Sequence, residues 1–198
     1  IKLNKYARLK LNIMCGAQNK SGMGMDTFDK HYGQCTFYLA KSSIAFLHIP
    51  KNASTSIRWL ARSPRWIRRA PISEVDYDRI CVILRDPQER FLSALNMYLG
   101  QRQSPENMCS IDQSHIDTND VHFMPQHKFL QGLDTSKMDF FYQEHDVVAS
   151  IRKYYGISGD QENQNHTKLK IVTDVNFDVM ENLYSKDYDL IESVNFKN

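Results

Sequence analysis

Short apolar runs alternate with amphipathic stretches along most of the chain. The runs with the length and composition of buried strands lie at 44–49, 79–84 and 138–142, and a last short strand is expected at 169–172. Helical patterns begin near Ser54, Asp86, Pro125 and Asp146, and two further helices are expected near 174–184 and 186–194. Because strands alternate with helices, the pattern predicts an α/β fold with a central parallel sheet flanked by helices.

The clearest helix signal starts at Asp86. Asp86 suits the N-cap, Pro87 suits the first helical position, and Glu89 completes a capping box. Apolar residues then recur on one face, and Gly100 is expected to end the helix. In the same way, Gly156 is expected to end the helix that begins near Asp146.

Composition indicates an ordinary globular protein. A length of 198 residues favours a single domain over 1–198, in which the polar segment 1–33 is irregular. The net charge of +2 gives no reason to expect nucleic acid as a partner. No run of about 18 apolar residues occurs, so no membrane span is expected. This favours a cytoplasmic enzyme, with a Golgi-lumenal domain lacking its anchor as the alternative.

The cysteines do not indicate a metal site. No two of them form a CxxC pair, so we expect no zinc and no required metal. Cys81 lies in an apolar run and is expected to be a buried thiol. Whether Cys15 and Cys35 form a disulfide stays open, because that depends on the compartment.

A loop of small and hydroxyl residues follows the first predicted strand, from Pro50 to Ser56. A loop between a strand and a helix presents unpaired backbone N–H groups and suits an anion. Lys51 adds a positive charge that could stabilise negative charge on a leaving oxygen. The alternative is a Ser/Thr-rich helix cap beside a solvated lysine.

A second phosphate signature runs from Arg85 to Ser93. Arg85 ends the second strand, and Ser93 lies two turns into the next helix, so both are expected to reach one phosphate. The alternative is a surface ion pair between Arg85 and Asp86 or Glu89. Because ligands bind at the carboxyl ends of parallel strands, the two motifs are expected to meet there.

These motifs resemble those of the sulfotransferases that use 3′-phosphoadenosine-5′-phosphosulfate (PAPS), especially the carbohydrate branch with the heparan sulfate 2-O-sulfotransferases. The segment 48–56, HIPKNASTS, is similar to the family's phosphosulfate loop, PKTGGTS or PKTASTS. The segment 85–93, RDPQERFLS, is similar to its RDPxxRxxS element. Residues 120–126 resemble a DxHxxPQ element, and 183–189 resemble the family's C-terminal helix. Together the resemblance covers roughly 44–194.

The resemblance implies a P-loop-like three-layer fold and in-line transfer of a sulfuryl group to an acceptor hydroxyl. The acceptor would be a carbohydrate, and the second product would be 3′-phosphoadenosine-5′-phosphate (PAP). By position, Arg85 and Ser93 would bind the 3′-phosphate. The 5′-phosphosulfate would be bound by Lys51, Asn52, Ala53, Ser54, Thr55 and Ser56. Lys51 would also act in catalysis.

The base that takes the proton of the acceptor is expected to be His122, whose pKa can lie near neutrality. Many relatives place a His or Glu between the two phosphate motifs, but 57–84 contains no His. The alternatives stay open, and they are Asp120, His115, His48, Glu144, His145 and, more weakly, Glu74. Lys168 is a further candidate for nucleotide contact.

Two other function classes remain as alternatives. A small-molecule kinase with a P-loop-like fold would need ATP and Mg²⁺, and the chain has no GxxxxGK[ST] loop. A non-catalytic nucleotide- or glycan-binding protein would keep the fold without a base. Basic residues between Arg58 and Arg69 are suited to an anionic glycan, although a solvated basic helix face gives the same pattern.

Overall fold

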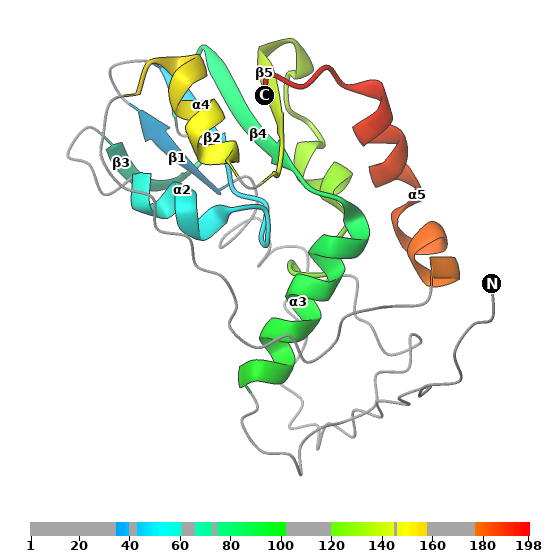
Figure 1. The fold of residues 1–198 in the computed structure, drawn as a ribbon. Coiled ribbons are helices and arrows are strands. Elements are labelled where there is room, and N and C mark those ends of the chain that lie inside the picture. The colour runs from blue at the N-terminus through cyan, green and yellow to red at the C-terminus, as the bar shows by residue number, and fades with distance from the viewer. Residues whose placement is uncertain are drawn as a thin grey trace.

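The computed structural model describes residues 35–39, 43–60, 66–72, 75–101, 120–144, 146–157 and 177–198. Its centre is a five-stranded sheet with the strand order β3-β1-β2-β4-β5 (Figure 1). The strands are β1 (Cys35–Leu39), β2 (Ile44–Leu47), β3 (Trp66–Pro71), β4 (Arg79–Leu84) and β5 (Met138–Tyr142). The helices are α2 (Ser54–Leu60), α3 (Pro87–Gln101), α4 (Val147–Tyr155) and α5 (Phe177–Ser193), with 3-10 turns η4 (Gln126–Leu130) and η5 (Thr135–Lys137).

The three predicted strands form the parallel part of the sheet. β2 pairs with β4, and β4 pairs with β5, both in parallel. All four residues of β2 and the last five of β4 are buried, as expected for strands that are covered on both faces. The prediction of an α/β fold with a central parallel sheet and flanking helices is therefore confirmed.

Two strands at one edge of the sheet were not indicated by the sequence. β1 pairs antiparallel with both β2 and β3, so the complete sheet is mixed. β3 falls in the basic segment 58–69, for which a helix face was the expected alternative. Its sequence WIRRAP has two arginines and a proline, so it lacks the continuous apolar run that marks β2 and β4.

Side chains alternate between two apolar layers, one on each face of the sheet. Ile44 and Phe46 pack with residues of α2 and α4, whereas Ala45 and Leu47 pack with residues of η4 and α5. The same alternation continues along β4. Cys81 is a free, buried thiol in the first layer, as predicted.

The sequence signals predicted the first residues of α2, α3 and α4 accurately. Asp86 caps α3 by accepting a hydrogen bond of 2.9 Å from the Glu89 N–H. The helix continues through Gly100 to Gln101, one residue beyond the expected end. Gly156 has a φ of 63° and ends α4, as predicted. None of the described helices is long and apolar enough to cross a membrane.

The C-terminal helical region is divided where the sequence predicts. α5 consists of two helical segments that meet at a kink at Tyr184, whose φ of −124° and ψ of 17° are not helical. The stretch 125–130 forms a 3-10 turn instead of an α-helix. The strand expected at 169–172, the segment 1–33 and Cys15 lie outside the described residues.

The chain beyond α5 covers the outer edge of β5. Phe196 forms a parallel bridge with Phe140, and the Lys197 N–H donates to the Phe140 carbonyl at 2.8 Å. The amide of Asn198 accepts from the Tyr142 N–H and donates to the Tyr142 carbonyl, each at 3.0 Å. A side-chain amide thus takes the place of a peptide group in the next strand.

A buried carboxylate joins the amino ends of β4 and β5. Asp139 is fully buried and accepts hydrogen bonds from Arg79 and from the hydroxyls of Tyr154 and Tyr155. Burial alone would raise the pKa of Asp139, but the hydrogen bonds from Arg79, Tyr155 and Tyr154 outweigh it and lower the pKa. The anion is therefore the form that the fold stabilises.

We expect Asp139→Asn to lower the free energy of unfolding by about 3 kcal/mol at neutral pH, because an amide cannot accept all these hydrogen bonds. With a lowered folded pKa, this stabilisation is present above the ordinary carboxyl pKa and is lost as pH falls through the folded value. Urea denaturation should show that the free energies of unfolding of wild type and Asp139→Asn differ at neutral pH and approach each other at acidic pH. Asp189→Asn, at an exposed position, is the control. If the difference in the free energy of unfolding between wild type and Asp139→Asn does not change with pH, the expectation is contradicted.

Candidate functional site

The two predicted phosphate motifs meet at the carboxyl end of the sheet. One loop follows β2 and contains Lys51, and the other follows β4 and begins with Arg85. The Arg85 guanidinium donates through Nη1 to the Lys51 carbonyl at 3.1 Å. Since β2 and β4 are parallel neighbours, their ends bring together segments that are 34 residues apart in the sequence. This arrangement is the one predicted from the strand order.

The loop after β2 turns tightly without glycine. Lys51 and Ala53 have φ values of 71° and 50°, in the left-handed region that non-glycine residues rarely adopt. Each such residue costs roughly 1 kcal/mol, so contacts elsewhere must hold the loop. Between them, the Asn52 N–H donates to the Ile49 carbonyl at 3.2 Å. Residues of this kind cluster at ligand-binding sites.

Asn52 faces into the protein. It is 3% exposed, and its side-chain amide donates to the Ile83 carbonyl at 2.7 Å and to Gln126 Oε1 at 2.5 Å. Because its backbone N–H is also bonded to Ile49, all three of its N–H groups have partners within the protein. Asn52 therefore braces the loop against β4, and its predicted contact with a ligand stays a prediction.

Arg90 joins this loop to the segment that carries His122. It is 1% exposed, and its guanidinium donates to the carbonyls of Pro50 at 3.0 Å, Met124 at 2.8 Å and Val121 at 3.2 Å. Burial lowers the pKa of Arg90 to about 10. The sequence analysis did not select Arg90, although it is the second arginine of the 85–93 motif.

Positive charge is concentrated around Lys51. Burial, followed by the nearby charges of Arg85 and Arg90, lowers the pKa of the half-buried Lys51 ammonium. A bound anion would offset this repulsion, so the site suits phosphate or sulfate. Glu89 is the nearest competitor, and its Oε2 lies 3.4 Å from Arg85 Nε at an exposed position. Such a pair is weak, so an anionic ligand can replace it.

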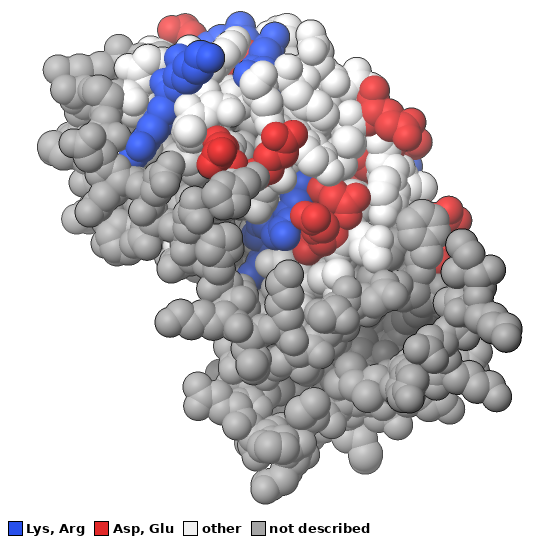
Figure 2. All heavy atoms as spheres, viewed as in Figure 1, with Lys and Arg blue, Asp and Glu red and all other residues white. Residues whose placement is uncertain are grey.

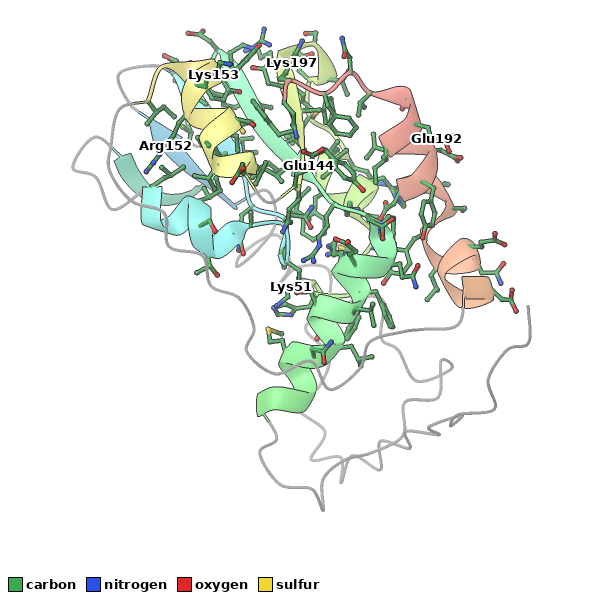
Figure 3. The ribbon with its side chains drawn as sticks, in the orientation of Figure 1. Lys51, Glu144, Arg152, Lys153, Glu192 and Lys197 are labelled. Atoms are coloured by element: carbon green, nitrogen blue, oxygen red, sulfur yellow. The ribbon has the colours of Figure 1, made fainter. Side chains whose placement is uncertain are left out.

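The surroundings of Lys51 are visible in the figures. Figure 3 shows Lys51 where the end of the sheet meets α3, with Glu144 on the sheet side. On the face drawn in Figure 2, basic and acidic side chains lie directly beside one another near the middle of the molecule. Opposite charges are in contact at this site between Arg85 and the exposed Glu89.

The remaining predicted phosphate ligands lie on α2 and α3. α2 begins at Ser54, where Ser54 and Ser56 are half-buried and Thr55 is exposed. Ser93 is half-buried and lies three residues after Arg90, so both share the face of α3 that is turned to the Pro50 loop. These residues therefore lie on the two helices that follow β2 and β4, and their contact with a phosphate stays a prediction.

His122 is paired with Asp120. Its Nδ1 lies 2.9 Å from Asp120 Oδ1, which also accepts the His122 backbone N–H at 2.8 Å. Both side chains are about one quarter exposed. Arg90 holds the carbonyls of Val121 and Met124, on either side of His122, so one guanidinium links the His122 segment to the Pro50 loop.

The other candidates for the base are placed as follows. His48 is buried directly after β2, and Glu144 is exposed shortly after β5. Asp120 is bonded to His122, which suits an orienting role more than that of an independent base. The base candidates Glu74, His115 and His145 lie outside the described residues, as does Lys168, the candidate for nucleotide contact.

A second histidine–aspartate pair was missed by the sequence analysis. His127 Nδ1 lies 2.8 Å from Oδ1 of Asp187, a fully buried residue of α5. Asp187 also accepts the backbone N–H groups of Gln126 at 2.7 Å and His127 at 2.9 Å. Nearby, the Tyr184 hydroxyl donates to the Phe123 carbonyl at 2.6 Å. α5 therefore holds segment 123–127 in addition to Arg90, which donates to the Met124 carbonyl.

A metal centre is not apparent in the part of the chain that the structure describes. There, no three His, Cys, Asp or Glu side chains gather closely enough to hold a metal ion. The two His–Asp pairs each have only two such members. Lys51, Arg85 and Arg90 supply positive charge at this site.

Replacing Arg90 by Met should destabilise the fold by about 3 kcal/mol, because three buried carbonyls would lose their donor. Equilibrium unfolding in urea measures this change. Lys128→Met makes a similar change at an exposed position of η4 and should have little effect. A loss below about 1 kcal/mol for Arg90→Met would show that the guanidinium does not hold the loops.

The arrangement has the properties of an anion site that carries a candidate base. Two loops at neighbouring strand ends supply a lysine, an arginine and several hydroxyls, and a histidine–aspartate pair is linked to them through Arg90. Comparison of the chain with models of protein families, with curated proteins and with solved structures finds no match.

Proposed function

We propose that this protein is a PAPS-dependent sulfotransferase that acts on an acceptor hydroxyl, with a carbohydrate as the expected acceptor. The contact between Arg85 and the Lys51 carbonyl carries the proposal, because it joins two motifs that each have another explanation alone. A helix cap would not need Arg85, and a surface ion pair would not need Lys51. Their union at a strand-end site suits a ligand with more than one anionic group.

The two ends of the nucleotide would bind to different loops. Lys51 and the N–H and hydroxyl groups from Ala53 to Ser56 would hold the 5′-phosphosulfate. Arg85 and Ser93 would hold the 3′-phosphate, with Arg85 exchanging the exposed Glu89 carboxylate for phosphate oxygens. A P-loop-like arrangement of the helices around the sheet belongs to this proposal.

PAPS supplies an activated sulfuryl group. The acceptor oxygen forms a bond to sulfur while the bond from sulfur to the bridging phosphate oxygen breaks, and the electron pair stays on that oxygen as PAP leaves. Lys51 stabilises this developing negative charge. Its pKa, lowered by burial and by Arg85 and Arg90, would rise on contact with the anion, which strengthens the interaction.

His122 would take the proton of the acceptor. A carboxylate at Nδ1 favours the tautomer in which Nδ1 carries the hydrogen and Nε2 has the lone pair. Asp120 would then stabilise the imidazolium that forms, so it is a positioning residue and not a second base. His127 with Asp187 is the competing pair, and mutation separates the two.

We expect PAP to bind the intact protein, and Lys51→Ala or Arg85→Ala to weaken binding about 10- to 100-fold, because each change removes a charged hydrogen-bond donor. Calorimetry measures the affinity. Lys153→Ala, at an exposed position on α4, is the matched control and should bind normally. No affinity for PAP in the wild-type protein would refute the proposal. Tighter binding of ATP with Mg²⁺ would favour the small-molecule kinase.

We expect His122→Ala to lower kcat about 10²- to 10⁴-fold and to leave PAP affinity unchanged, because a base acts only on the chemical step. Asp120→Asn should give a smaller loss and shift the pH profile of kcat. Transfer of labelled sulfate from PAPS to a panel of sugars and phenols measures the rate. If His127→Ala abolishes transfer and His122→Ala does not, the base belongs to the other pair.

A further inference from the structure

The side-chain amide of Gln126 is bonded to both backbone groups of Arg85. The Arg85 N–H donates to Gln126 Oε1 at 3.0 Å, and Gln126 Nε2 donates to the Arg85 carbonyl at 2.8 Å. The same Oε1 accepts from the Asn52 amide at 2.5 Å. Gln126 thus contacts the loop after β2 and the loop after β4 with one amide group.

Gln126 has little freedom to move. It is 1% exposed, and its backbone N–H donates to the buried Asp187 carboxylate at 2.7 Å. Asp187 belongs to α5, so the amide is fixed by an element 61 residues further along the chain. A buried side chain held at both ends can transmit a fixed geometry to the groups it contacts.

We propose that Gln126 is a positioning residue that sets the separation between the 5′-phosphosulfate loop and the 3′-phosphate loop. The proposal rests on the function proposed above. It follows from the shape of the ligand, because PAP carries two phosphates at a separation fixed by one nucleoside. Both phosphates are bound at full strength only if the loops already stand at that separation.

The role requires an amide, because Gln126 accepts two hydrogen bonds and donates one to Arg85. Methionine has a similar volume and cannot make these hydrogen bonds. A glutamate carboxylate keeps both accepted bonds but repels the Arg85 carbonyl. When that carboxyl is protonated, its O–H donates to the carbonyl, and the full set of hydrogen bonds returns.

The test compares PAP with adenosine 5′-phosphate (AMP), which lacks the 3′-phosphate. If the separation between the two loops is no longer fixed, the affinity for PAP should fall about 10-fold or more. The affinity for AMP, which uses one loop, should change less than about 3-fold. Gln126→Met should show this loss of preference. Gln126→Glu should show it at high pH and recover the wild-type preference at low pH, where the introduced carboxyl is protonated.

The control is Gln131→Glu, which makes the same chemical change at an exposed position just after η4. Each variant is compared with wild type at the same pH, because the phosphates of PAP also titrate. The proposal is overturned if Gln126→Met weakens PAP and AMP equally, or if Gln126→Glu at low pH is no better than Gln126→Met. If Gln126→Met fails to fold, Gln126→Glu still tests the proposal, because a preference for PAP over AMP that does not improve from high to low pH would overturn it.

A measurement without ligand separates this proposal from the proposed function. Hydrogen exchange of the peptide that contains Arg85 should quicken in Gln126→Met, because the Arg85 N–H loses its acceptor. If wild type binds neither PAP nor AMP and hydrogen exchange of this peptide still quickens in Gln126→Met, the proposed function is wrong, but Gln126 does join the two loops. If wild type binds PAP and neither exchange nor preference changes in Gln126→Met, the positioning role is wrong.

Discussion

The buried guanidinium of Arg90 is the interaction on which the site depends. It donates to the carbonyls of Val121 and Met124, on either side of His122, and to the Pro50 carbonyl. Two loops without regular structure are therefore bonded to one rigid donor group. A charged group is costly to bury, and burial lowers the pKa of Arg90 accordingly. Three carbonyls and the ring of Phe129, whose centroid lies 5.9 Å from the Arg90 guanidinium carbon, offset part of that cost.

The three basic residues that build the site, Lys51, Arg85 and Arg90, also leave it short of negative charge. Arg85 and Arg90 both act against the protonation of Lys51, and Glu89 approaches Arg85 only from an exposed position. The folded protein contains this repulsion and also two non-glycine residues of the same loop, Lys51 and Ala53, in left-handed conformations. Strain and unbalanced charge in one loop are typical of sites that gain stability when a ligand binds.

Local signals in the sequence predicted much of the fold. β2 and β4 were found because they contain continuous apolar runs, β5 because MDFFY is rich in apolar and aromatic residues, and α3 because Asp86 and Pro87 mark its start. β1 was missed although its sequence, CTFYL, consists largely of strand-forming residues, and β3 was missed because WIRRAP contains two arginines and a proline. The contact between the two motifs was predicted because parallel strands end at one edge.

The supports of the site could not be predicted in the same way. The amide of Asn52 donates to Ile83 and to Gln126, which is 74 residues away in the sequence, and no local pattern indicated this bracing role. Asp187 was not selected from the sequence, and it is fully buried. Such roles depend on contacts between distant segments, and no local pattern of residue types records them.

The covered edge of β5 bears on the behaviour of the protein at high concentration. An open strand edge is a template onto which another chain can add a strand, and this is a common start of aggregation. The Lys197 N–H bonds to the Phe140 carbonyl and the Asn198 amide bonds to both backbone groups of Tyr142, so these outward groups are not open to another molecule. The few residues after α5 thus keep neighbouring molecules from joining their sheets at this edge, a task unrelated to the chemistry at the carboxyl end.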